Sequence, residues 1–166
     1  MKGQSKGAGL MGFRKDREVK ERVHDTYKSR QKMVEPTLCP QCGALFQKGR
    51  WIWGLRPPNF HETTCPACHR TKDKYPAGFL HVGGAFFNEH RDELLNLVHN
   101  EEALAKKDHP LSRLMGVEEK EGGVQITTTD THLPRRIGEA LKHAYQGELQ
   151  LHYGEGEYSV RVSWKR

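Results

Sequence analysis

The sequence predicts a mixed α+β protein in three parts: a basic arm over residues 1–35, a small cysteine-containing module over 36–75 and an α+β domain over 76–166. Three observations support this division. All four cysteines of the 166-residue chain lie in the second part. Apolar residues recur at strand and helix spacing over long stretches only in the third part. The first part carries most of the net positive charge.

The arm is basic and contains few residues that could form a core. Residues 1–35 hold ten Lys and Arg against five Asp and Glu, a net charge of +5, whereas residues 36–166 hold seventeen against sixteen. Val19, Val23 and Tyr27 recur every fourth residue and predict a thin helical stripe. Such a stripe is too narrow to fold alone. We therefore expect the arm to be largely disordered, or ordered by a polyanionic partner, with a merely solubilising tail as the alternative.

The second part contains two C-x2-C motifs, Cys39 with Cys42 and Cys65 with Cys68, separated by twenty-two residues. Each motif can form a tight knuckle, and two knuckles supply the four thiolates that tetrahedral Zn2+ prefers. We therefore expect one structural Zn2+ in a zinc ribbon with four cysteine ligands, without the open position that a catalytic zinc keeps. Two disulfides are the alternative. Ten His, strong charge and no signal peptide instead indicate a cytoplasmic chain, where thiols stay reduced.

Two other features of this module bear on the metal. His61 and His69 lie close to the motifs, but with four Cys available we expect both at the surface or beside the ligands. A thioredoxin-like role is not expected either, because neither C-x-x-C pair is predicted to lie between a strand and a helix.

Residues 50–53 (RWIW) alternate, so both Trp side chains are expected on one face of a short strand. At least one Trp should cover the metal site. Trp53, flanked by Arg50 and Arg56, is either buried as well or exposed as a stacking platform for a base or a rim for protein contact.

The third part predicts the order β-α-β-β-α-β plus one strand, which is the split β-α-β pattern of ferredoxin-like domains. Strands are expected at 78–82, 114–118, 124–128, 149–153 and 158–164, and helices at 86–107 and from about 131 to a stop at Gly147. The helices should cover one face of the sheet. The other face shows small polar residues without an aromatic pair, which argues against base stacking in the manner of RNA-recognition motifs.

Arg135 and Arg136 are expected at the start of the second helix. Cations beside helix N-terminal amides can bind phosphate, with a plain solvated helix face as the alternative. The sequence has no P-loop, no dinucleotide-binding glycine motif and no nucleophile elbow, so we expect no enzyme. No apolar run approaches about 18 residues, so no membrane span is expected.

The motifs resemble those of a small family of bacterial zinc-ribbon proteins. The matching segments are HDTYKSR, EPTLCPQCG, GRWIWG and AYQGEL, and the resemblance extends over nearly the whole chain. More distantly, the chain from Cys65 onward resembles the N-terminal region of the archaeal and eukaryotic adaptor that escorts the large ribosomal subunit out of the nucleus. The matching features are CHR at 68–70 and TDTHL at 129–133. In that family the strand after the second cysteine motif usually ends in Arg, and this chain has Gly83 at that position. This resemblance implies association with the ribosome or ribosomal RNA.

We therefore expect a non-enzymatic, cytoplasmic zinc-ribbon protein that binds the ribosome or structured RNA. The alternatives are a protein-interaction or regulatory module that uses the ribbon and a DNA-binding regulator. The candidate RNA contacts are basic residues of the arm, residues around the Trp pair and the two arginines of the second helix: Arg14, Lys15, Arg17, Lys20, Arg22, Lys28, Arg30, Lys32, Arg50, Trp53, Arg56, Arg135 and Arg136.

Overall fold

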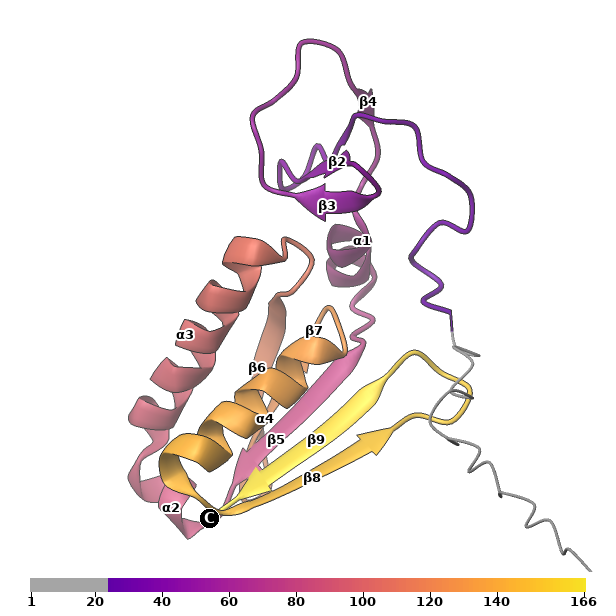
Figure 1. The fold of residues 1–166 in the computed structure, drawn as a ribbon. Coiled ribbons are helices and arrows are strands. Elements are labelled where there is room, and N and C mark those ends of the chain that lie inside the picture. The colour runs from indigo at the N-terminus through magenta and orange to yellow at the C-terminus, as the bar shows by residue number, and fades with distance from the viewer. Residues whose placement is uncertain (1–23) are drawn as a thin grey trace, which may run out of the picture.

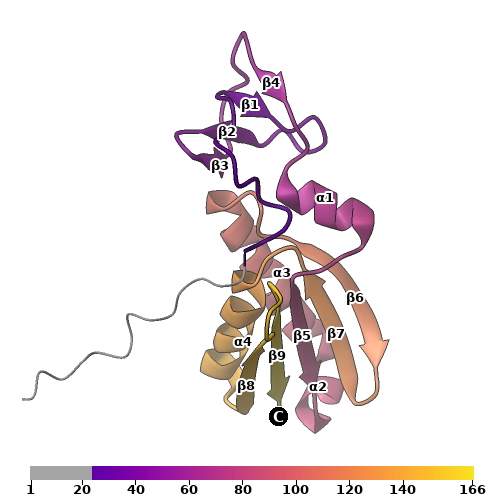
Figure 2. The same cartoon turned by 90° about the vertical axis from the view of Figure 1, so that its right-hand side faces the viewer.

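The computed structural model describes residues 24–166 and shows a mixed α+β fold with two sheets and four helices in that range (Figures 1 and 2). A small sheet lies at one end of the molecule, and helix α1 (Pro66–Asp73) connects it to a larger sheet. The predicted α+β class is confirmed. None of the helices in the described range has the length and apolar character that a bilayer crossing requires.

The small sheet has four very short strands. Their spatial order is β3 (Arg50–Ile52), β2 (Leu45–Gln47), β1 (Thr37–Leu38) and β4 (His61–Glu62). The β2–β3 turn has left-handed backbone at Lys48 and Gly49, and its two N–H groups donate to the Glu35 carboxylate at 2.8 and 3.0 Å. Glu35 thus stabilises the turn from a different part of the chain.

Helix α1 is an element that the sequence did not predict. Cys65 is its N-cap, Pro66 occupies its first turn, and it ends at Lys74 in left-handed conformation. The first turn of a helix tolerates proline, because an N–H group at that position would have no partner within the helix. The second cysteine motif therefore lies between strand β4 and a helix, and the expectation that neither motif would do so is wrong.

The larger sheet has five strands around a central β5 (Gly78–Gly83). The spatial order is β6 (Leu114–Lys120), β7 (Gly123–Thr128), β5, β9 (Val160–Lys165) and β8 (Glu148–Tyr153). β5 runs antiparallel to β7 and parallel to β9. All five predicted strands are present, and β5 and β6 are separated by β7 as a split β-α-β unit requires.

The adjacency of the last two strands departs from the ferredoxin-like arrangement, in which the strand after the second helix lies beside the first strand. Here β9 takes that position and β8 is moved to the edge. The burial of the two strands gives the reason. Val160, Val162 and Trp164 of β9 are buried, whereas Leu151 and Tyr153 of β8 are exposed. The more apolar strand occupies the interior of the sheet, where it pairs on both sides.

Three helices pack against one face of the larger sheet: α2 (Ala85–Glu89), α3 (Arg91–Asp108) and α4 (His132–Tyr145) (Figures 1 and 2). The single helix expected over 86–107 is interrupted at His90, which has φ of −122°. Within α3, Leu94, Val98 and Ala105 are buried, whereas Leu104 is exposed. The Asp130 carboxylate accepts a hydrogen bond from the Leu133 N–H at 3.0 Å, so it pairs one of the free N–H groups in the first turn of α4.

The opposite face of the sheet is open. β5 places Phe79 at its centre, and the Arg161 guanidinium lies 4.2 Å from that ring's centroid. The prediction that this face carries no aromatic pair was made from the residues of the later strands, and it overlooked the single ring of Phe79.

Residues 24–35 cross from the larger sheet toward the small sheet without forming a helix or strand. Tyr27, the only described member of the predicted helical stripe, lies in a turn, so the helix is not found in this segment. Val19 and Val23 lie outside the described residues, as do the candidate contacts Arg14, Lys15, Arg17, Lys20 and Arg22.

Candidate metal centre

The four cysteines converge on one point between the small sheet and α1. The Sγ atoms of Cys39, Cys42, Cys65 and Cys68 all lie within 4.8 Å of one another, and those of Cys42 and Cys65 are 3.8 Å apart. No disulfide joins them. This arrangement is compatible with one metal ion held by all four sulfurs.

The first knuckle closes through backbone hydrogen bonds. The N–H of Gly43 donates to the Cys39 carbonyl at 2.9 Å, and the Cys39 N–H donates to the Ala44 carbonyl at 2.8 Å. Gly43 has φ of +77°, a value that glycine adopts without strain. The short return turn therefore directs Cys39 and Cys42 to the same side.

The second knuckle is the first turn of α1. The Cys68 N–H donates to the Cys65 sulfur at 3.4 Å, and the Cys65 N–H donates to the Cys39 sulfur at 3.2 Å. Backbone N–H groups and a helix N-terminus both favour a thiolate over a thiol. The two knuckles are thus linked directly to each other as well as through the common centre.

Arg113, in the segment between α3 and β6, completes the surroundings of the four sulfurs. Its guanidinium donates to the sulfur of Cys68 at 3.3 Å and to that of Cys42 at 3.1 Å. The same side chain donates through Nε to the Pro110 carbonyl at 2.7 Å, which fixes its direction. Sequence reasoning missed Arg113, because no local spacing relates it to cysteines far earlier in the chain.

Burial and the surrounding N–H groups act on the thiol pKa values in opposite directions. Burial works against the Cys39 thiolate, but the N–H groups of Cys65, Cys42 and Gln41 outweigh it and lower the pKa of Cys39 to about 7. Burial raises the pKa values of Cys65 and Cys68.

Burial also disfavours the charged form of Arg113. Its bonds to the sulfurs of Cys68 and Cys42 outweigh this effect and raise its pKa. One guanidinium therefore offsets one of the four negative charges that four thiolates would bring together, and a divalent metal ion would offset two more. Four sulfur donors with N–H support fit a structural metal ion well.

Apolar side chains shield the centre. Ala44 and Ala67 are buried beside the cysteines, and Trp51 and Leu111 pack against them. Trp53 points elsewhere: its indole N–H donates to the Lys106 carbonyl at the end of α3, at 2.7 Å. Trp51 is therefore the tryptophan that covers the site. Trp53 contacts helix α3, and 39% of the Trp53 surface is exposed. Both nearby histidines, His61 and His69, are exposed and outside the cluster.

A buried ion pair fixes the start of the described chain to α1. Asp25 is 6% exposed and accepts from the Arg70 guanidinium at 2.6 Å. The rings of Tyr27, Tyr158 and Tyr75 surround that guanidinium, with centroids 4.4, 5.6 and 5.8 Å away. Residues 24–35 are thus docked against the folded body rather than separate from it.

The candidate RNA contacts in the described range do not form one surface. Lys28, Lys32 and Arg50 line the same cavity, whereas Arg30 lines a different one. Arg56 lies 4.6 Å from the centroid of the Phe60 ring.

The two arginines of α4 are engaged with carboxylates. Arg135 pairs with Glu139 at 2.9 Å, and Arg136 pairs with Glu101 of α3 at 2.8 Å. Hydrogen bonding to Glu139 also raises the pKa of Arg135. This edge is better described as an ion-paired helix surface than as a prepared phosphate site.

Comparison of the sequence with models of protein families gives no match, and comparison with curated proteins gives no significant match. Function must therefore be inferred from the residues themselves.

Proposed function

We propose that this chain is a non-enzymatic, cytoplasmic zinc-ribbon protein that binds the ribosome or structured RNA. In this proposal residues 36–75 form the ribbon, and the ion is one Zn2+ held by Cys39, Cys42, Cys65 and Cys68. Four thiolates in a tetrahedral cluster favour Zn2+ over harder cations. Because all four positions belong to the protein, the ion is structural and takes no part in a reaction.

The observation that carries the RNA part is the separation of charge along the chain. Residues 1–35 hold +5 of the net charge of +6. A segment of this kind binds polyanions by releasing their counterions, which gives affinity without sequence selectivity. The folded body supplies what the charge alone lacks, namely a fixed position and direction for that segment.

The role of the metal follows from the path of the chain. The centre fixes the start of α1, α1 carries Arg70, and Arg70 binds Asp25. The basic segment therefore leaves the body from a place that the metal helps to define. Zinc contributes to binding through this geometry and not by contacting the nucleic acid.

The test is co-sedimentation with ribosomes at two salt concentrations, with RNase-treated lysate as the control. Full-length protein is compared with a chain lacking residues 1–23, because removal of Asp25 and Glu35 would also disturb the body. We expect the full-length protein to sediment with ribosomes and the shortened chain to bind much more weakly. Equal binding by both would reject the arm as the anchor. Competition with duplex DNA distinguishes RNA binding from a DNA-binding regulator.

One observation favours a second candidate, a protein-interaction module that uses the ribbon. Leu55, in the loop between β3 and β4, is 94% exposed, and Val34 beside the small sheet is 58% exposed. Exposed apolar residues of this kind are typical of contact surfaces when they gather. Binding that resists salt and is lost in Leu55→Ser would support this candidate instead.

A further inference from the structure

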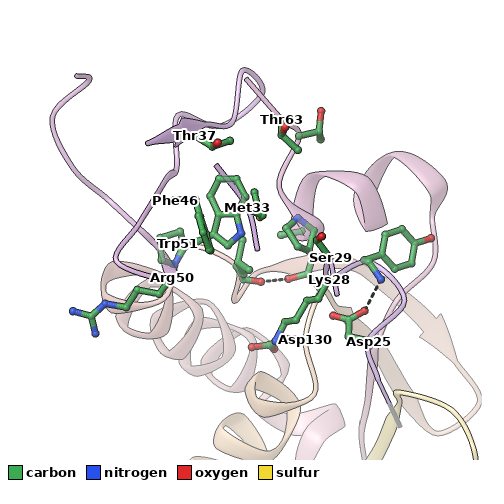
Figure 3. A pocket seen from close by; sticks show the side chains of 18 of the residues that line it. Asp25, Lys28, Ser29, Met33, Thr37, Phe46, Arg50, Trp51, Thr63 and Asp130 are labelled. Carbon is green, nitrogen blue, oxygen red and sulfur yellow. Dashed lines mark hydrogen bonds between the residues drawn. The ribbon is translucent and has the colours of Figure 1, made fainter. Parts of the chain in front are cut away.

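A cavity of about 1040 Å³ lies where residues 25–35, the small sheet and the loops at the near end of the larger sheet meet (Figure 3). Its volume is at the upper end of the range usual for small-ligand sites. The basic segment does not merely pass this cavity: Lys28, Lys32 and Glu35 are among the residues that line it. A polyanion held by the arm would therefore be guided to its entrance.

One wall of the cavity is aromatic. Trp51 of β3 and Phe46 of β2 pack edge to face with centroids 5.5 Å apart, and both line the cavity (Figure 3). Trp51 is half-buried and also packs against the cysteine cluster, which holds its ring in place. A fixed indole beside an accessible space is the kind of surface on which nucleic-acid bases stack.

Three cations surround this space. Lys28, Lys32 and Arg50 are exposed and line the cavity, and within residues 24–166 none of them forms an ion pair. Figure 3 shows Lys28 extending across the cavity toward Asp130 and Arg50 pointing outward. Exposed, unpaired cations can contact phosphates without first breaking a bond to the protein.

The acidic residues of the cavity are mostly engaged with protein donors. Asp25 binds the Arg70 guanidinium, Glu35 accepts two N–H groups of the β2–β3 turn, and Asp130 accepts the N–H of Leu133. Glu62 is the exception among the carboxylates that line the cavity. With three of its four carboxylates bonded to protein donors, the cavity leaves the side chains of Lys28, Lys32 and Arg50 to contact an anion.

We propose that this cavity binds a nucleotide of single-stranded RNA, with the base stacked on Trp51 and the adjoining phosphates facing Lys28, Lys32 and Arg50. The proposal rests on the proposed function, since it names the place in the folded body where bound RNA is held. It assigns the stacking role to Trp51. Trp53, the residue expected from the sequence, uses its indole N–H on helix α3.

The first experiment compares two triple variants of the full-length protein with equal loss of charge. One carries Lys28→Gln, Lys32→Gln and Arg50→Gln at the cavity, and the control carries Lys106→Gln, Lys107→Gln and Lys142→Gln at exposed helix positions. Affinity for a short fluorescein-labelled oligouridylate is measured by anisotropy over a salt series. Loss of three phosphate contacts should make the slope of log K against log salt shallower by about 2 in the cavity variant. The slope of the control variant should change little.

The second experiment tests the stacking residue. Trp51→Phe and Trp53→Phe each replace an indole by a smaller aromatic ring, whereas Trp51→Leu removes the aromatic ring altogether. Zinc content and melting temperature are measured for all three variants. We expect Trp51→Leu to weaken oligouridylate binding on the order of tenfold and Trp51→Phe to weaken it less. Trp53→Phe should bind like the wild type. If Trp51→Leu does not fold, cross-linking of 4-thiouridine RNA to the wild-type protein still locates the base, with adducts expected on the segments that carry Trp51 and Met33.

The possible outcomes separate the two proposals. RNA that binds equally well to both triple variants, with cross-links confined to residues 1–23, would overturn the cavity site and leave the proposed function intact. A wild-type protein that fails to bind ribosomes or oligouridylate even at low salt would overturn both. Selective loss of affinity in the cavity variant, together with cross-links beside Trp51, supports the site.

Discussion

At the scale of single residues, two arginines hold separate parts of the molecule together by different means. Arg113 donates to sulfurs of both knuckles, whereas Arg70 pairs with one carboxylate inside a group of tyrosine rings. Neither contact could be predicted from the sequence, because each partner lies more than forty residues away and follows no periodic pattern. The four cysteines could be predicted because their spacing itself encodes the geometry that a metal requires.

Replacement of Arg113 by Gln should weaken metal binding. The guanidinium donates to three of the four sulfurs, and loss of such outer contacts usually lowers metal affinity about 10- to 100-fold. The measurement is competition with a chelator of known affinity under reducing conditions. Arg91→Gln, which removes an exposed arginine paired with Glu119, is the matched control and should bind metal normally. Unchanged affinity in Arg113→Gln would mean that the guanidinium does not support the thiolates.

Replacement of Asp25 by Ala should destabilise the protein. The change leaves the Arg70 guanidinium, 1% exposed, without its carboxylate, and breaking one side of a buried pair costs about 3–5 kcal/mol. The free energy of unfolding from urea titration provides the measurement. Glu139→Ala removes the partner of an exposed arginine and should leave the midpoint almost unchanged. Similar midpoints for both variants would show that the docking of residues 24–35 contributes nothing to stability.

At the scale of elements, apolar periodicity predicted all the strands of the larger sheet and the presence of helical segments at 86–107 and after Thr131. It did not predict the interruption at His90 or the position of β9 inside the sheet, since both depend on packing between distant segments. Helix α1 was missed because its mean character is polar and only Ala67 and Arg70 are buried. Its start is set by a cysteine that also belongs to the metal cluster.

Ile137→Asp should strongly destabilise the larger sheet and its helices. Ile137 is fully buried on the inner face of α4, and an unpaired charge placed there is expected to cost several kcal/mol. Lys142→Asp on the exposed face of the same helix is the control. The two variants are compared by thermal melting. If Ile137→Asp melts like the wild type, the assignment of the inner face is wrong.

If the cysteine cluster holds the proposed metal ion, Cys65→Ser should release it and unfold the small sheet and α1 while much of the larger sheet persists. The residue provides both a ligand position and the N-cap of α1, so its loss removes two supports at once. Metal ligands in modules of this size contribute directly to folding. Elemental analysis reports the metal, and hydrogen exchange reports each region separately. Fast exchange restricted to residues 36–75 is expected; retention of stoichiometric metal would contradict the proposed ligand set.

At the scale of the whole molecule, positive charge is concentrated in the first residues of the sequence. Residues 1–23 alone hold seven Lys and Arg against three Asp and Glu. The interpretation of the sequence took residues 1–35 as one unit. In the described range, Asp25 and Glu35 are both bonded to the folded body, so residues 24–35 belong with it. The cavity could not be predicted at all, since its lining comes from distant parts of the chain, within residues 25–67, 109–112 and 129–132 and at Tyr158.

Ribosome or RNA binding should be steeply sensitive to salt. If about five phosphates are neutralised, log K should fall with log salt at a slope of about −3.5 to −4.5. Deletion of residues 1–23 should remove the part of that slope that does not come from Lys28, Lys32 and Arg50 at the cavity. Changing Arg14, Lys15, Arg17, Lys20 and Arg22 to Gln should weaken binding without altering zinc content or melting. A slope that is the same with and without these residues would place the contacts elsewhere in the chain.

The interior position of β9 also constrains the order in which the chain can fold. β5 is the central strand, yet one of its two partners arrives only near the end of the chain, with Gly78 paired to Val160. Pairing between such distant segments is slow, and until it forms one edge of β5 has no partner. An open strand edge is prone to join other chains. During synthesis this protein therefore passes through a stage in which α3, β6 and β7 can already be assembled while the centre of the sheet is still exposed on one side.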